Sequence, residues 1–206
     1  IHHPDVRRML MSMRAQIEGS RALAYVAAAM SDKAHHHADA EVRKQNQAAY
    51  EFLVPIVKGW STELSLDVTS TGVQVHGGMG FIEETGAAQY YRDAQILTIY
   101  EGTTAIQAND LVGRKTYRDA GAVAKHFIAQ VRATEAELLA TDDANLKAIA
   151  LQLAIGAQAM EEVVDFVVVN FKADIKAVFS GSVPYLKLSG VVLGGWQMAR
   201  AALIAQ

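Results

Sequence analysis

Apolar residues recur at intervals of three and four along most of this 206-residue chain, a spacing that places them on one face of an α-helix. The pattern is clearest in residues 5–31, which we expect to form one long helix facing a core. Its apolar positions are Val6, Met9, Leu10, Met13, Ile17, Leu23, Ala27 and Met30. The sequence therefore predicts an all-α fold.

The same spacing predicts further helices, separated by breaks in the pattern. Residues 32–39 contain a histidine run without periodic apolar positions, so we expect a connector there. The next helix should start near Leu53 and run to Val75, because Pro55 fits a first helical turn and disfavours a helix interior. Later helices are expected over residues 83–95, from Thr103 or Thr104 to about residue 113, from Asp119, from Asp142 or Asp143, and after Pro184.

Two features of the second half bear on its organisation. The β-branched run at residues 163–169 raises the alternative of a strand. Helical spacing continues on both sides of the run and no partner strand is evident, which favours a helix. A break near residues 116–120 predicts a division into a first bundle, residues 1–116, and an additional helical region, residues 117–206.

Charge and composition exclude several classes of protein. With 19 basic and 22 acidic residues the net charge is −3, which argues against a protein that binds nucleic-acid phosphates. The absence of cysteine excludes disulfides, thiol nucleophiles and sulfur-ligated metals. It is also compatible with the reducing cytoplasm, which is the location we expect. The longest charge-free apolar stretches are shorter than the roughly 20 residues that cross a bilayer, so we expect no membrane span. The chain begins at Ile1 without a leader sequence, and we expect it to be part of a longer protein.

A glycine cluster follows the predicted end of the second helix, in the stretch Gln74-Val75-His76-Gly77-Gly78-Met79-Gly80-Phe81. Such a cluster has two interpretations. Glycines commonly end helices, and they also let backbone amides and a neighbouring glutamine approach a phosphate closely. The cluster differs from a Rossmann fingerprint because no strand precedes it.

Glu101 stands before Gly102 in a short stretch between two predicted helices. An acid beside a glycine is ordinarily a surface residue. In an apolar pocket, however, desolvation raises the pKa of a carboxylate and makes it a competent base near neutral pH. Thr103 and Thr104 would then present hydroxyls and first-turn amides beside it.

Other polar groups carry weaker signals. His35, His36 and His37 are adjacent and do not make a shaped coordination site, so no metal is predicted. Arg92 and Asp93 are expected to have a structural role, either as a surface ion pair or as a buried pair that orders the segment leading to Glu101.

Three motifs occur together, and in this order they closely resemble the C-terminal helical domain of acyl-CoA dehydrogenases. They are Gln74-x-x-Gly77-Gly78-x-Gly80-Phe81, Tyr91-Arg92-Asp93-Ala94, and Ile99-Tyr100-Glu101-Gly102-Thr103-Thr104-x-Ile106-Gln107. The resemblance covers residues 1–116. The remainder is similar to the additional helical region of the branch that includes 3-methylthiopropanoyl-CoA dehydrogenases.

The resemblance implies FAD-dependent α,β-desaturation of an acyl-CoA thioester. Glu101 matches the carboxylate that removes the α-proton, and its backbone amide would help to hold the thioester oxygen. Tyr100 and Gly102 would border the substrate. The positions matching cofactor contacts fall in two groups, the first near an FAD held mainly by a neighbouring subunit and the second near the FAD of the same subunit. The first comprises Gln74, His76, Gly77 and Gly78, and the second Thr103, Thr104 and Ala105.

The resemblance also implies electron-transfer flavoprotein as the electron acceptor and assembly as a homodimer or homotetramer. Complete family members carry an N-terminal helical domain and a central β-domain before this region. We therefore expect this chain alone to bind FAD poorly and to have little catalytic activity. Two alternatives remain at this stage. One is a helical assembly module without chemistry of its own, and the other is a related flavin oxidase on the same fold.

Overall fold

The computed structural model describes residues 1–205 and contains helices and turns but no strand in that range. The all-α prediction is confirmed. The long helices are α1 (Pro4–His36), α2 (Ala40–Val75), α6 (Ala122–Leu139), α7 (Ala144–Asn170) and α9 (Ser182–Ile204). The shorter elements are α3 (Gly78–Phe81), η1 (Glu83–Thr85), α4 (Ala87–Gln95), η2 (Ile96–Thr98), α5 (Thr104–Asp110), the π-helical turn η3 (Leu111–Tyr117) and α8 (Ile175–Ser180).

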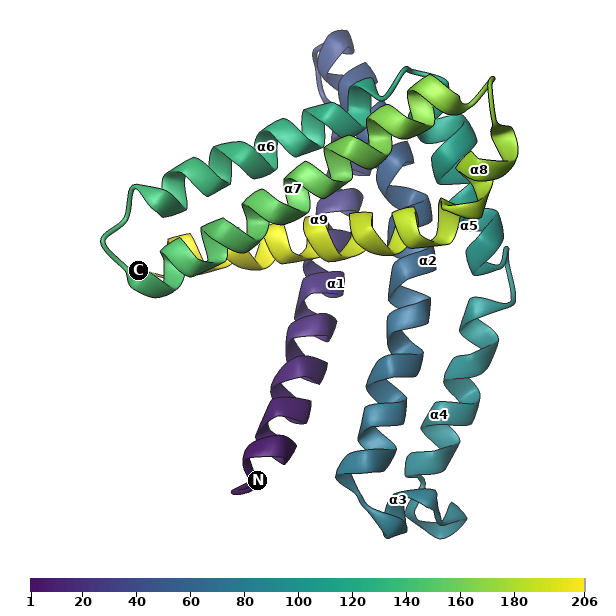
Figure 1. Ribbon diagram of the computed structural model, residues 1–206, viewed down its shortest axis with the longest axis vertical. Helices are drawn as coiled ribbons and strands as arrows, with labels where there is room; N and C mark the ends of the chain where they lie inside the picture. The colour runs from purple at the N-terminus through teal and green to yellow at the C-terminus, as the bar shows by residue number, and fades with distance from the viewer. Residues whose placement is uncertain (206) are drawn as a thin grey trace.

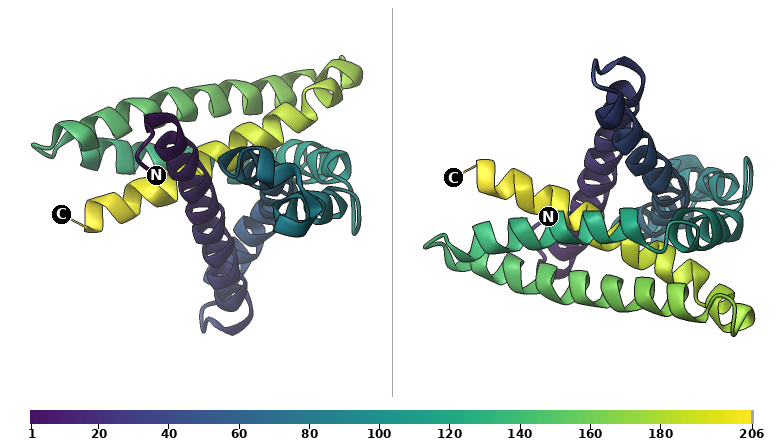
Figure 2. Two further views of the ribbon diagram at one scale, coloured as in Figure 1. Left: turned by 90° about the horizontal axis from the view of Figure 1, so that it is seen from below. Right: turned by 90° about the horizontal axis from the view of Figure 1, so that it is seen from above.

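The helices form two crossing layers. Figure 1 shows α1, α2 and α4 running alongside one another, while α6, α7 and α9 lie across them at a steep angle. The two end-on views of Figure 2 place α9 between the α1–α2 pair and the α6–α7 pair. The end of α2, together with α3 and the start of α4, projects away from this crossing (Figure 1).

The core lies where the two layers cross. It is one continuous cluster of buried side chains that draws on both predicted segments. Phe52 of α2 stacks on Phe127 of α6 with ring centroids 5.5 Å apart, and Trp196 of α9 donates from Nε1 to Thr134 Oγ1 at 2.8 Å. The division at residue 116 remains a proposal, and the two segments share this core.

The first helix is longer than predicted. It continues through the histidine run to His36, which leaves a connector of only three residues before α2. Lys33, His35 and His36 occupy its last turn, where cationic and polar side chains suit the negative end of the helix dipole. Exposed residues need no apolar periodicity to be helical, so the pattern ended before the helix did.

The second helix begins thirteen residues before the predicted start at Leu53. Asp39 caps it by accepting a hydrogen bond from the Glu41 N–H at 2.8 Å, and Pro55 lies in the helix interior. An interior proline costs about 3 kcal/mol in an isolated helix. Here Phe52, Leu53 and Ile56 around it are fully buried, and burial of such side chains contributes about 1.5–3 kcal/mol each. Packing therefore outweighs the local preference.

Other boundaries agree in part with the sequence. Residues 163–169 are helical within α7, as predicted, and Asp143 is the cap of this helix, one of the two candidates from sequence. The expected helix over residues 83–95 is split by Gly86, which adopts φ 80° between η1 and α4. Helix α9 starts before Pro184 instead of after it, with the proline in its first turn. The short helix α8 was not predicted.

Candidate functional site

Glu101 lies in a strained turn between η2 and α5. It has φ 54°, and Gly102 follows with φ 95°, so two successive residues adopt left-handed backbone conformations. A left-handed conformation at a residue other than glycine costs of order 1–3 kcal/mol and persists only where surrounding contacts hold it. The turn leaves the Glu101 side chain exposed at the surface.

Those contacts come from Lys58 of α2. Its ammonium donates to three carbonyl oxygens of residues 97–103, a segment we call the Glu101 loop: Leu97 at 2.9 Å, Tyr100 at 3.0 Å and Gly102 at 2.8 Å. The ammonium nitrogen also lies 5.7 Å from the centre of the Tyr100 ring. A hydrogen bond from a charged donor contributes about 1.5–3 kcal/mol, so three of them can offset the strain at Glu101. Lys58 was not among the residues chosen from sequence, although a lysine among the apolar positions of a core helix was a signal.

The surroundings of the Glu101 carboxylate are open and partly apolar. Ile99, Tyr100 and Ile106 expose about half of their surface beside it, at 54%, 46% and 57%. The Glu101 N–H donates to no acceptor among residues 1–205. The chain thus places a carboxylate, a free amide donor and apolar side chains together, and it does not itself enclose the carboxylate in an apolar pocket.

The side chains of the three predicted cofactor residues at the start of α5 point in two different directions. Thr103 is exposed and caps the helix, its hydroxyl accepting from the Ile106 N–H at 3.3 Å, and Ala105 is also exposed. Thr104 is buried and donates to the Glu63 carboxylate at 2.5 Å. Thr103 and Ala105 therefore share the surface of the Glu101 loop, whereas the Thr104 side chain points into the bundle.

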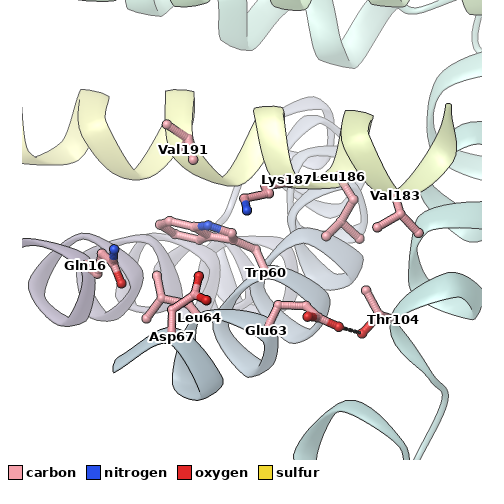
Figure 3. Close-up of a pocket in the computed structure, with 10 residues that line it drawn as sticks. All are labelled: Gln16, Trp60, Glu63, Leu64, Asp67, Thr104, Val183, Leu186, Lys187 and Val191. Atoms are coloured by element: carbon pink, nitrogen blue, oxygen red, sulfur yellow. Dashed lines mark hydrogen bonds between the residues drawn. The ribbon is translucent and has the colours of Figure 1, made fainter. Parts of the chain in front are cut away.

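A cavity of about 300 Å³ lies on the inner side of Thr104. Figure 3 shows it between α2 and α9, with the Trp60 indole across its middle and the Glu63–Thr104 hydrogen bond at its edge. Lys187 enters from α9 and Asp67 from α2. Glu63 was not among the residues chosen from sequence. Its position one turn after the core residue Trp60 was the signal that its side chain lies on the inner face of α2.

The glycine cluster combines a helix end with one close backbone approach. Helix α2 stops at His76, whose ring Nδ1 lies 2.8 Å from the Gly72 oxygen, and Gly77 turns the chain with φ 61°. Gly80 is buried, and a Cβ there would stand 2.2 Å from the Val73 oxygen. At Gly77 and Gly78, by contrast, a Cβ would meet nothing within 4 Å, so the surface around them is open. Gln74 is exposed beside them.

The two groups of predicted cofactor residues are far apart in the chain's own structure. The Glu101 loop is bound to Lys58, whereas the glycine cluster follows Val75 at the end of the same helix (Figure 1). At a rise of 1.5 Å per residue, that separation is about 25 Å along α2.

Arg92 and Asp93 do not pair with each other. Arg92 instead bonds Glu83 at 2.5 Å, because neighbouring residues of a helix point in different directions. Both partners are well exposed, and a surface pair of this kind contributes little stability. It links η1 to α4 without reaching Glu101.

Comparison with known proteins decides the family. Residues 1–116 match the family described as acyl-CoA dehydrogenase, C-terminal domain, which is more than half of the chain. The chain belongs to the acyl-CoA dehydrogenase family. Residues 127–206 match a second description, acetyl-CoA dehydrogenase C-terminal like. No helix among residues 1–205 is long and apolar enough to cross a membrane.

Curated relatives confirm the branch that the second half of the chain indicated. The chain is 51% identical to 3-methylmercaptopropionyl-CoA dehydrogenase of Ruegeria pomeroyi, over all of this chain and 35% of that protein. It is 33% identical to the broad-specificity linear acyl-CoA dehydrogenase FadE5 of Mycobacterium tuberculosis, over 99% of this chain and 34% of the relative. A third relative, the caffeyl-CoA reductase-Etf complex subunit CarC of Acetobacterium woodii, is 32% identical over 48% of this chain and 23% of its own length. The chain spans about a third of the length of the first two.

Proposed function

We propose that the complete protein is an FAD-dependent acyl-CoA dehydrogenase that desaturates an acyl-CoA thioester, with Glu101 as the base that removes the α-proton. The observation that carries this proposal is the Glu101 loop. The Glu101 carboxylate stands on a left-handed turn next to a backbone N–H that has no acceptor within residues 1–205, in a chain of the acyl-CoA dehydrogenase family.

The described residues fit an FAD in the two proposed places. Thr103 offers a hydroxyl hydrogen and Ala105 a small exposed side chain beside Glu101. Gly77 and Gly78 offer open backbone at the far end of α2, where Gln74 and His76 could reach polar parts of a second flavin. The distance between the two groups supports their division between two FAD molecules in a homodimer or homotetramer.

Three residues of the Glu101 loop have proposed tasks in the reaction. When bound, FAD supplies the acceptor for the hydride that leaves the β-carbon. The Glu101 carboxylate takes the α-proton, and the Glu101 N–H donates to the thioester oxygen, where negative charge develops as that proton leaves. Tyr100 and Gly102 border the substrate. The remaining walls, which would exclude water from the carboxylate, would come from the rest of the full-length protein.

Assembly and electron transfer are part of the same proposal. Met79, Phe81 and Tyr90 expose large apolar side chains around α3 and the start of α4, with Phe81 83% exposed. Such a patch favours a protein–protein contact, which a homo-oligomer would supply. We propose electron-transfer flavoprotein as the electron acceptor, an assignment supported by the name of the relative from Acetobacterium woodii.

The test is the substitution Glu101→Gln in the full-length protein, with Glu84→Gln as the matched control because Glu84 is an exposed glutamate of η1. Loss of a general base lowers turnover by about 10²–10⁴-fold. We expect this loss in acyl-CoA-dependent dye reduction by Glu101→Gln, with FAD content near wild type, and none in Glu84→Gln. Unchanged turnover in Glu101→Gln would remove this residue from the mechanism.

A further inference from the structure

We propose that Lys58 is a positioning residue for the reaction: its ammonium holds the Glu101 loop in the reactive conformation and strengthens the Glu101 N–H as a hydrogen-bond donor. This inference rests on the proposed role of Glu101 as the base. It assigns a task to a residue on a different helix, 43 positions earlier in the chain.

The three hydrogen bonds of Lys58 lie around the strained turn. A lysine ammonium has three hydrogens, and all three are directed at the Glu101 loop. The Tyr100 carbonyl belongs to the peptide that enters Glu101, and the Gly102 carbonyl to the peptide that leaves Gly102. Lys58 therefore fixes the chain on both sides of the two left-handed residues, whose backbone is the strained part. Without these bonds the turn can relax, and the carboxylate moves with it.

Lys58 also acts on the peptide group between Tyr100 and Glu101. The Tyr100 carbonyl and the Glu101 N–H belong to the same amide, so a cation 3.0 Å from the oxygen draws electron density from the nitrogen. The Glu101 N–H therefore becomes a stronger hydrogen-bond donor. It has no acceptor within residues 1–205 and is available to a substrate. A preorganised donor of this kind stabilises an oxygen that gains negative charge when an α-proton is removed.

A comparison within the chain separates Lys58 from an ordinary structural lysine. Lys115 and Lys125 also link different elements, and each does so by bonding a carboxylate, Glu51 at 2.9 Å and Asp165 at 2.6 Å. The bonds of Lys58 within the described residues all go to main-chain carbonyls of the Glu101 loop. Among residues 1–205 no carboxylate forms an ion pair with Lys58, so the charge of its ammonium acts on the carbonyl groups of the loop.

The experiment uses the full-length FAD-loaded protein with four variants. Lys58→Met removes the ammonium and keeps the length of the side chain, and Lys58→Arg restores a cation. Lys44→Met is the matched control, because Lys44 is an exposed lysine of the same helix, and Glu101→Gln reports on the base itself. The readouts are kcat, KM and FAD content, together with α-proton exchange into deuterated water from a 3-thiaacyl-CoA. That analogue carries sulfur at its β-position and so has no hydride to transfer, which isolates the proton step.

We expect Lys58→Met to lower both kcat and the α-exchange rate by about 100-fold, the effect of misplacing a reactive group by about 1 Å. KM and FAD content of Lys58→Met should stay within twofold of wild type. The rate of Lys58→Arg should be at least tenfold higher than that of Lys58→Met, and Lys44→Met should match wild type. Hydrogen–deuterium exchange of the resting protein gives a second readout, since the Ile99 and Tyr100 amides, both bonded to Ile96, should exchange faster in Lys58→Met.

The outcomes separate the two proposals. If Glu101→Gln abolishes α-exchange and Lys58→Met leaves it unchanged, the role of Lys58 is wrong and that of Glu101 stands. If Glu101→Gln itself retains α-exchange, the proposed function fails. A Lys58→Met protein that loses FAD in proportion to its activity would also overturn the inference, because Lys58 would then act in folding or cofactor retention only.

Discussion

Gly190 of α9 lies against the indole of Trp60 of α2, so closely that a Cβ at Gly190 would stand 2.2 Å from Trp60 Cγ. Gly194, one turn later, meets the far edge of the same ring, where a Cβ would be 2.5 Å from Cη2. Two glycines on one face of α9 thus form the surface onto which the tryptophan packs. This contact joins the predicted additional region to the first bundle, next to the cavity of Figure 3.

The first prediction tests that contact. Gly190→Ala should lower the free energy of unfolding by about 1–3 kcal/mol, because the added methyl group overpacks against a buried ring. Gly195→Ala is the matched control on the same helix, since a Cβ there meets nothing within 4 Å and alanine favours a helix by about 0.5–1 kcal/mol. Urea denaturation measures both. Equal stabilities of the two variants would show that α9 can move away from Trp60 without cost.

The second prediction concerns the buried hydrogen bond between the hydroxyls of Tyr185 and Thr116, 3.0 Å apart. Tyr185→Phe should lower the free energy of unfolding by about 1 kcal/mol at neutral pH, because it leaves the Thr116 hydroxyl without its partner. Calorimetry or chemical denaturation at pH 7 measures the loss. A variant as stable as wild type would mean that Thr116 finds another acceptor inside its helix.

The same tyrosine predicts a dependence on alkaline pH. Burial raises the pKa of Tyr185 above its ordinary value of 10.0. The folded state then keeps the neutral phenol while the unfolded chain ionises, so the stabilisation is complete below pH 10 and declines as pH rises above it. The difference in stability between wild type and Tyr185→Phe should therefore shrink between pH 9 and pH 11. A difference that stays constant over that range would contradict the assigned pKa direction.

The third prediction tests a helix cap. The Asp143 carboxylate accepts from the Asn145 N–H at 2.7 Å and the Leu146 N–H at 3.2 Å at the start of α7. Asp143→Ala should lower the free energy of unfolding by about 1 kcal/mol. The control is Asp142→Ala, an exposed neighbour that makes neither bond, and it should have a much smaller effect on the melting temperature.

The fourth prediction separates two glycines of the cluster. Gly80→Ala should destabilise the end of α2 and α3, because its Cβ would collide with the Val73 carbonyl. Gly78→Ala should leave stability unchanged, since the space there is open and Gly78 has no positive φ. If Gly78 approaches a flavin as proposed, the full-length Gly78→Ala protein should nevertheless retain less FAD, measured by absorbance after gel filtration. Wild-type flavin content would remove Gly78 from the proposed cofactor site.

Local sequence was sufficient for some parts of the fold and misleading for others. Each of two helix caps was predicted to within two adjacent residues, because short polar side chains precede the apolar periodic runs, and the structure selects Asp143 and Thr103. Pro55 led to a wrong helix start, because the rule for proline describes an isolated helix and not one packed by Phe52 and Ile56. Arg92 was assigned a neighbour in sequence, whereas its partner Glu83 comes from another element.

The sequence by itself determined the all-α class, the family and the identity of Glu101 as the candidate base. Helical spacing is a pattern of nearby residues, and each of the three motifs is a short stretch of the chain. Tertiary structure decided which groups act together. Lys58 and Glu101 lie 43 positions apart, and only the packing of α2 against the Glu101 loop directs the ammonium at the carbonyl groups around the carboxylate. Hydrogen bonds between distant elements depend on how the helices cross, and no local pattern of residues encodes that crossing.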